Sequence, residues 1–156
     1  MLEEMLFPGA VRLGHQAVNW QEAVKTCGRL LVAVGAAEER YVEAMLRVVR
    51  DLGPYIVLAP GFAMPHARPE EGVLRPALSL VTLRTPVVFG HPDNDPVDIL
   101  VGLAALDAGE HVEALADLAY LMSQPEYPVA LREARTPWDA LQVIRRAVGA
   151  RQLSDD

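Results

Sequence analysis

The chain has 156 residues and a formal net charge of −7, and 51% of its residues are apolar while only 6% are aromatic. This length predicts a single domain over residues 1–156 with an aliphatic core. The acidic balance argues against nucleic-acid binding and against docking on an anionic membrane, because both need clustered Lys and Arg. The acidic start of the chain and the lack of an apolar stretch of about 20 residues predict a cytoplasmic protein without a membrane helix.

Two helices are expected in the first third of the chain. Asn19 is a typical helix N-cap, and apolar residues at helical spacing follow it up to Gly35, which ends the pattern. A weak strand over residues 11–18 precedes this helix. A second amphipathic helix is predicted over residues 38–52, where a Gly-Pro pair stops it.

Short strands and turns fill the middle of the chain. A β-rich run at residues 55–58 precedes residues 59–69, whose three prolines and one glycine exclude a long regular element. Strands are predicted over residues 77–83 and 86–89, followed by a turn-rich loop. The nearly continuous apolar run over residues 97–106 is typical of a strand covered on both faces.

Three helices are predicted after the last strand. Asp107 has the position of an N-cap for a helix over residues 108–123, and Glu110 has the spacing of a capping box. Two further helices follow over residues 126–134 and 136–148. The order of helices, strands and helices predicts an α/β fold in which a sheet carries helices on both faces. The helix over residues 108–123 is expected to bury Val112, Leu115, Ala119 and Met122.

His66 is the most informative of the four histidines. It lies between small residues, which leave space for a bulky group on the imidazole, and Pro65 restricts the backbone just before it. An imidazole nitrogen is nucleophilic near neutral pH, because the reference pKa of histidine is about 6.5. Arg68, two positions further on, can pair with phosphate oxygens. A histidine that only makes a hydrogen bond in a turn has the same local pattern, and spacing alone favours that interpretation.

His111 is expected in the first turn of the helix over residues 108–123. Free backbone N–H groups and the positive end of the helix dipole collect there, so a phosphate can bind at this place. The spacing to Leu115 also puts His111 on the inner side of the helix. A half-buried histidine at a helix end is therefore the plainer interpretation.

The loop around His91, Asp93 and Asp95 has two interpretations. Histidine and carboxylates suit Zn²⁺ or Mn²⁺, which makes a metal-dependent hydrolase one alternative. Asp-Asn-Asp-Pro is also an ordinary turn sequence in which side chains bind backbone N–H groups, and this interpretation is favoured. Asp98 interrupts an apolar strand, so it lies at the strand entrance or needs a buried partner, and ordering a histidine is one role open to it.

Cys27 is the only cysteine, so no internal disulfide is possible. Its place on the inner side of the first helix favours a packed thiol over a nucleophile. The chain has no Gly-rich phosphate loop and no Gly-x-Ser-x-Gly motif, which leaves a nucleotide site and a serine hydrolase without support.

The most specific motif is the segment Pro65-His66-Ala67-Arg68-Pro69-Glu70-Glu71-Gly72. Gly53-Pro54-Tyr55, residues 89–98, residues 104–107 and the pair Glu110-His111 add to it. Together these segments resemble the mannitol/fructose-type enzyme IIA domains of the bacterial sugar phosphotransferase system, and most closely their ascorbate branch. The resemblance spans nearly the whole chain.

The resemblance implies a three-layer α/β sandwich with a central mixed five-stranded sheet. It implies that His66 is phosphorylated and that His111 lies beside it and helps to bind the phosphoryl group, with Arg68 and Asp98 as further phosphate-binding candidates. No metal or organic cofactor is expected, because in-line transfer between two nucleophiles needs only positioning and charge neutralisation.

The resemblance also implies the partners. The donor would be the phosphorylated histidine carrier protein HPr, and the acceptor would be a cysteine of an enzyme IIB, which phosphorylates a sugar entering through a membrane enzyme IIC. We expect these partners to dock on a shallow, partly apolar depression, with Phe62, Met64 and the loop around Asp93 as candidates for its rim. The apolar helices also allow a homodimer.

One departure from the family pattern concerns arginine. Mannitol- and fructose-type relatives usually carry Met-Leu-x-Arg-Glu in the helix before the site, whereas Met45-Leu46-Arg47 is followed here by two valines. Arg47, Arg50 and Arg68 are open alternatives for that charge. A regulatory domain of the same fold, whose phosphorylated His66 controls other proteins, is a second interpretation beside transport of L-ascorbate or a related sugar.

Overall fold

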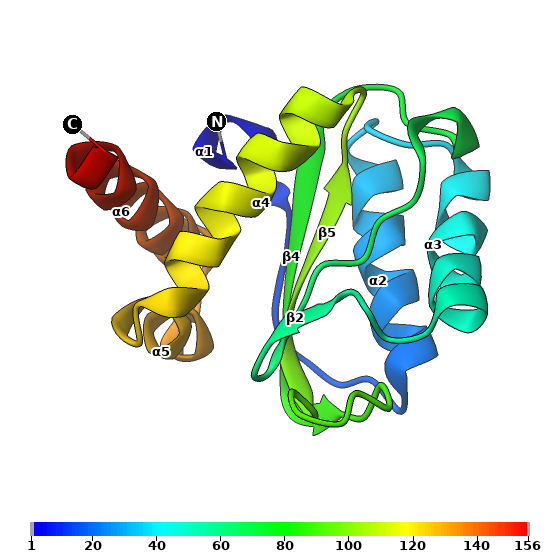
Figure 1. Ribbon diagram of the computed structural model, residues 1–156, viewed down its shortest axis with the longest axis horizontal. Coiled ribbons are helices and arrows are strands. Elements are labelled where there is room, and N and C mark those ends of the chain that lie inside the picture. The colour runs from blue at the N-terminus through cyan, green and yellow to red at the C-terminus, as the bar shows by residue number, and fades with distance from the viewer. Residues whose placement is uncertain (1, 156) are drawn as a thin grey trace.

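The computed structural model describes residues 2–155, arranged as in Figure 1. The chain begins with α1 (Leu2–Met5), β1 (Leu6–His15), α2 (Trp20–Ala33) and α3 (Glu39–Leu52). Its middle holds β2 (Val57–Ala59), β3 (Phe62–Ala63), a short 3-10 helix η1 (Pro69–Glu71), β4 (Ala77–Val87) and β5 (Val97–Ala104). Three helices complete it: α4 (Ala108–Ser123), α5 (Glu126–Glu133) and α6 (Pro137–Asp155).

The strands form one mixed sheet in the order β1-β4-β5-β3-β2. β1 lies parallel to β4, β4 antiparallel to β5, and β3 parallel to β5. The short β2 is an antiparallel edge strand beside β3. In the register between β3 and β5, Phe62 pairs with Ile99 and Ala63 with Leu100. The segment that leads from β3 to His66 therefore leaves the sheet alongside the second half of β5.

Helices cover both faces of this sheet (Figure 1). α2 and α3 pack on one face over a core that includes Tyr41 and Leu100. α4, α5 and α6 lie on the other face, over a core that includes Leu80 and Ile99. This arrangement confirms the expected α/β sandwich with a central mixed five-stranded sheet. None of the helices within residues 2–155 combines the length and the apolar character that crossing a membrane requires.

Local capping signals determine where the helices begin. Asn19 Oδ1 accepts the backbone N–H of Glu22 at 3.0 Å at the start of α2. Asp107 Oδ1 accepts the N–H of Glu110 at 2.8 Å at the start of α4. Each cap satisfies an N–H group that has no partner inside the helix. In both helices the capping residue and the residue that donates the N–H are only three positions apart.

The strands and the last helix differ in extent from the sequence prediction. β4 is one strand with an irregular register between Thr82 and Val87, where two strands were expected. Phe62–Ala63 pair as β3 inside the proline-rich segment, because that segment is extended beside β5. α6 continues to Asp155 instead of ending near residue 148.

The buried face of α4 also differs from the prediction. Val112 and Ala119 are exposed, whereas Ala114, Leu118 and Leu121 are buried. Apolar residues occupy more than one side of this helix, so periodicity does not select the buried side. Packing against α6 and the sheet makes that selection.

Candidate functional site

Backbone hydrogen bonds hold the segment that carries His66. The Met64 N–H donates to the Ile56 carbonyl at 2.9 Å, and the Leu103 N–H donates to the Pro65 carbonyl at 2.9 Å. Proline restricts φ at position 65 as well. The segment is therefore anchored to the β2 side and to the end of β5 just before His66.

Tyr41 of α3 holds Ala67, the residue that follows His66, from inside the core. Its ring is fully buried, and its hydroxyl accepts the Ala67 N–H at 3.0 Å and donates to the Leu103 carbonyl at 2.7 Å. Burial raises the pKa of Tyr41 to about 12, so the hydroxyl stays protonated. The hydroxyl thus links α3, the His66 segment and the end of β5.

The hydrogen bonds of His66 define its proton positions. Nδ1 lies 2.8 Å from the Met64 carbonyl, which only accepts, so this nitrogen carries the proton of the neutral ring. Nε2 then holds the free lone pair, and the Tyr55 hydroxyl donates to it at 3.3 Å. Burial is the main cause that lowers the pKa of His66, and the nearby His111 ring adds to it, against the opposing bond to Met64. These contacts favour the neutral form of the half-buried ring, with Nε2 unprotonated.

His111 lies beside His66, although 45 positions separate them. The two ring centroids are 5.0 Å apart, with an angle of 71° between the planes. His111 occupies the first turn of α4, which Asp107 caps. Both rings open onto a surface depression of about 280 Å³, whose other lining residues are Ala67, Pro69, Leu103, Ala105, Asp107 and Ala108.

The arginine candidates lie next to this depression rather than in it. Arg68 is exposed and lines a neighbouring hollow together with Arg47. The Arg47 guanidinium lies 3.8 Å from Glu71, and that of Arg50 lies 3.1 Å from Glu43. The Arg68 side chain makes no hydrogen bond or ion pair with any residue in the described range 2–155, although its backbone carbonyl accepts the Glu71 N–H at 3.0 Å. The Arg68 guanidinium is therefore an exposed cation without an ionic partner in the described range, two residues from His66.

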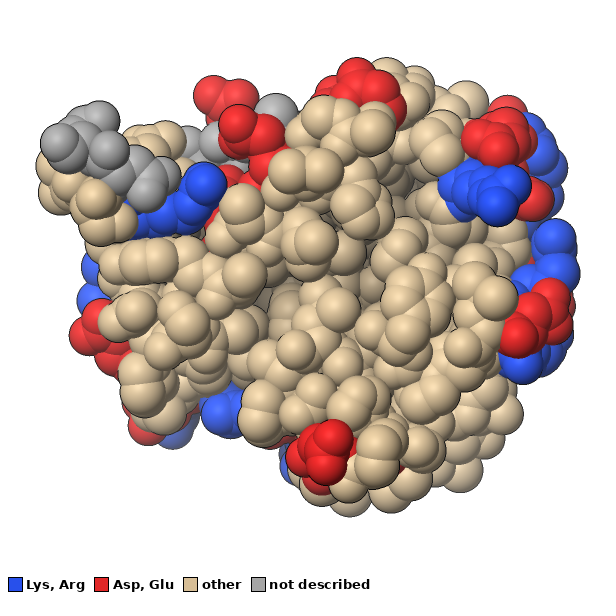
Figure 2. Space-filling view, in the orientation of Figure 1, with Lys and Arg blue, Asp and Glu red and all other residues tan. Residues whose placement is uncertain are grey.

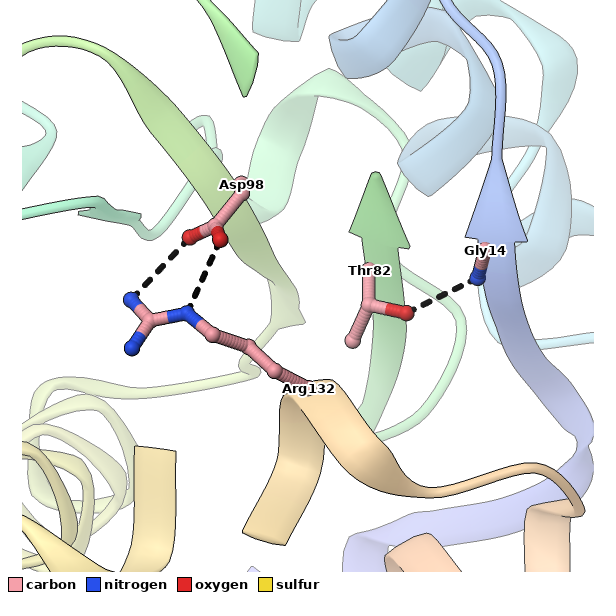
Figure 3. Close-up of polar contacts among 4 residues, drawn as sticks. All are labelled: Gly14, Thr82, Asp98 and Arg132. Carbon is pink, nitrogen blue, oxygen red and sulfur yellow. Dashed lines mark hydrogen bonds and ion pairs between the residues drawn. The ribbon is translucent and has the colours of Figure 1, made fainter. Parts of the chain in front are cut away.

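The structure does not bring Asp98 to the histidines. Figure 3 shows its carboxylate in a two-point pair with Arg132 of α5, at 2.8 and 3.1 Å. Asp98 lies at the start of β5, while Leu103 at the site is five residues further on, or about 16 Å along the strand. Its partner is thus a guanidinium from a distant helix, which corrects the expectation that Asp98 orders a histidine or binds phosphate.

The Asp98–Arg132 pair also explains a glycine in the turn before His66. Gly61 has a φ of 77°, and a Cβ there would lie 3.0 Å from Arg132 Nη2 and 3.2 Å from Asp98 Oδ1. Its carbonyl accepts the N–H groups of Asp98 and Ile99, both at 3.0 Å. This contact fastens the beginning of the His66 segment to β5.

The loop after β4 uses its polar side chains to bind its own backbone. The Asp95 carboxylate accepts N–H groups of three residues, at 2.6 Å from Gly90 and 2.9 Å from His91 among them. His91 Nδ1 accepts the N–H groups of Asp93 and Asn94 at 3.1 and 3.0 Å. No group of three or more metal-ligating side chains occurs in the described part of the chain. The geometry fits the turn interpretation, and the hydrolase alternative is not favoured.

The surface beside the histidines is apolar, but its lining differs from the prediction. Phe62 and Met64 are each only 1% exposed, so they support the site from below and do not form its rim. A groove of about 530 Å³ runs between β2 and α4, and its lining includes Leu58, Leu115 and Met122. Figure 2 shows that the middle of this face carries little charge.

Three residues of this region lacked a usable sequence signal. Tyr41 has the spacing of an ordinary core residue, and Arg132 lies on a helix far along the chain from Asp98. Tyr55 belongs to the Gly-Pro-Tyr motif, but nothing local indicates its contact with His66.

Cys27 is buried as predicted, and burial raises the pKa of its thiol to about 12, which suits a packing role.

Comparisons with known proteins agree with this geometry. Residues 4–147 match the family model described as phosphoenolpyruvate-dependent sugar phosphotransferase system, EIIA 2. The chain is 48% identical over 142 residues to the ascorbate-specific PTS system EIIA component of Escherichia coli K12, covering 90% of this chain and 92% of that protein.

Solved structures show the same similarity. The mannitol-specific cryptic phosphotransferase enzyme IIA of E. coli superposes with a TM-score of 0.81 at 34% identity, over 93% of this chain and 98% of that one. The E. coli mannitol enzyme IIA, solved in complex with phosphorylated enzyme IIB, gives a TM-score of 0.79 at 25% identity, over 89% and 96% of the two chains.

Proposed function

Because this chain belongs to the family of EIIA 2 components of the phosphoenolpyruvate-dependent sugar phosphotransferase system, we propose that it is a phosphocarrier that uses His66. The carrier accepts a phosphoryl group from phosphorylated HPr and passes it to a cysteine of an enzyme IIB. The observation that carries the proposal is the neutral His66 ring, with Nε2 unprotonated, beside His111 at an open depression. The names of the similar proteins support L-ascorbate as the sugar.

The hydrogen bond from Nδ1 to Met64 makes Nε2 the attacking atom. The lone pair of Nε2 forms the new N–P bond while the donor's N–P bond breaks and its electron pair returns to the donor nitrogen. No proton leaves His66, since Nδ1 keeps its hydrogen bond to the Met64 carbonyl. In the next step a cysteine thiolate forms an S–P bond, and the electron pair of the N–P bond returns to Nε2.

His111 and the start of α4 are suited to hold the phosphoryl oxygens. The ring of His111 is 5.0 Å from that of His66 and comes from the first turn of the helix. The first N–H groups of a helix lack internal partners and attract anions. Arg68 is exposed and unpaired within residues 2–155, so its flexible side chain supplies a further positive charge as the phosphoryl group arrives.

Partner docking is proposed over the apolar groove between β2 and α4. This groove shares α4 with His111, since its lining residue Leu115 lies one helical turn further on, and the middle of this face carries little charge, which suits transient contacts with two partners in turn. The complex of the mannitol enzyme IIA with phosphorylated enzyme IIB supports an enzyme IIB as one of them. HPr as donor, an indirect link to a membrane enzyme IIC, a cytoplasmic location and a homodimer remain predictions. The ascorbate-specific relatives favour transport over the regulatory alternative.

Incubation with phosphoenolpyruvate, enzyme I and HPr tests the proposal, with intact mass as the readout. We expect a gain of one acid-labile phosphoryl group, and none in His66→Ala. His111→Ala should accept the group but transfer it poorly to enzyme IIB. His15→Ala is the matched control, because His15 ends β1 and contacts Thr26 instead of the site. Phosphorylation of His66→Ala to the wild-type level would refute the assignment.

A further inference from the structure

Tyr55 makes a contact with His66 that the transfer chemistry described so far does not use. Its hydroxyl lies 3.3 Å from Nε2, and the two rings meet edge to face with centroids 6.0 Å apart. Within residues 2–155 this is the hydroxyl's sole hydrogen bond. Tyr55 is 48% exposed, so an alternative bond to water costs little.

The direction of this hydrogen bond follows from the other ring nitrogen. The Met64 carbonyl requires a proton on Nδ1, so Nε2 of the neutral ring only accepts. The Tyr55 hydroxyl is therefore the donor, and it lies on the lone pair that attacks phosphorus. Burial raises the pKa of Tyr55, so the phenol keeps its proton throughout.

The backbone around Tyr55 is held by hydrogen bonds, while its side chain is half-exposed. The Val57 N–H donates to the Pro54 carbonyl at 3.0 Å, and the Ile56 carbonyl accepts the Met64 N–H at 2.9 Å. The half-exposed ring is not enclosed by the core. Rotation of the side chain is therefore enough to move the hydroxyl off the lone pair and keep it next to any group bound there.

We propose that Tyr55 is a further residue of the transfer site, which covers Nε2 in the resting protein and binds a phosphoryl oxygen once His66 is phosphorylated. This inference rests on the proposed function of His66. The N–P bond forms as the donor bond breaks, and Tyr55 only exchanges one acceptor, the lone pair, for another, an oxygen of the phosphoryl group. The new acceptor is anionic, so the bond is stronger after transfer than before it.

Tyr55→Phe removes the hydroxyl and keeps the ring, and Tyr120→Phe on α4 is the matched control. In the unphosphorylated protein, we expect the ¹⁵N resonance of His66 Nε2 to move toward that of an unbonded imidazole nitrogen in Tyr55→Phe alone. With phosphorylated HPr, we expect the transfer equilibrium to shift toward HPr by about fivefold, because the lost bond to the charged phosphoryl group is stronger than the lost resting bond to Nε2.

The two readouts separate the possible failures. If Tyr55→Phe leaves the ¹⁵N resonance of Nε2 unchanged, the contact between Tyr55 and unphosphorylated His66 is wrong. If it leaves the transfer equilibrium unchanged, the contact between Tyr55 and the phosphoryl group is wrong. If the wild-type protein takes no phosphoryl group from HPr, the proposed function fails and the transfer role of Tyr55 fails with it. The ¹⁵N measurement then still decides whether the hydroxyl covers Nε2.

Discussion

Tyr41→Phe is the sharpest test of how the core positions the site. The substitution removes only the hydroxyl that accepts the Ala67 N–H at 3.0 Å and donates to the Leu103 carbonyl at 2.7 Å. Both backbone groups lose a partner in a place where Tyr41 itself is fully buried. An unsatisfied buried polar group costs about 1–3 kcal/mol, and Ala67 is half-buried, so we expect a total loss of about 2–3 kcal/mol.

Thermal and urea unfolding measure this loss. For a chain of this length, a loss of about 2–3 kcal/mol corresponds to a fall in Tm of roughly 5–10 °C. Phosphorylation of His66 should slow as well, because Ala67, the residue after His66, loses its hydrogen bond to the Tyr41 hydroxyl. Tyr120→Phe is the control, since that hydroxyl has no partner among residues 2–155. A Tyr41→Phe protein within 2 °C of the wild type would refute the claim that this hydroxyl holds the site.

Two further predictions concern the ion pair and the pH dependence. Asp98→Asn should lower the free energy of unfolding by only about 1 kcal/mol, because the ion pair with Arg132 is partly exposed. The rate of phosphoryl transfer should stay unchanged. Slower transfer would contradict the placement of Asp98 away from His66. The lowered pKa of His66, caused mainly by burial, keeps its ring neutral below the reference value of about 6.5. NMR titration of the His66 ring checks this, with His111, Tyr55 and Asp107 as the titratable neighbours, and a midpoint at or above 6.5 would contradict it. Since the unfolded chain binds this proton first, the contribution of His66 to stability is complete above about pH 6.5 and is lost as the pH falls through its lower folded-state pKa.

Local sequence signals predicted the parts of the fold that depend on neighbouring residues. The N-caps Asn19 and Asp107 accept N–H groups three positions away, so the short sequence around them contains both partners. The apolar run of β5 is buried as its composition indicates. Where more than one side of an element is apolar, as on α4, the same kind of reasoning selects the wrong face.

Local sequence patterns did not identify the partner of a charged residue when that partner lies far along the chain. Asp98 in an apolar strand indicates that a partner is needed, but it does not say which one. The partner is Arg132, 34 positions away, and the strand puts the pair at the end of β5 that lies far from His66. Asp95, inside a turn-forming sequence, has its partners within six residues and fits the local interpretation.

By itself, the sequence determined the α/β class, the helix starts and a stiff proline-bounded segment with a histidine in its middle, because each depends on residues close together in the chain. The family resemblance also implied that His111 lies beside His66, whereas tertiary structure alone decided that Tyr41 ties the segment to β5 and that Tyr55 contacts Nε2. These contacts join residues 45, 26 and 11 positions from their partners. Their geometry depends on how α3, α4 and the sheet pack, which is a property of the assembled core rather than of any one segment.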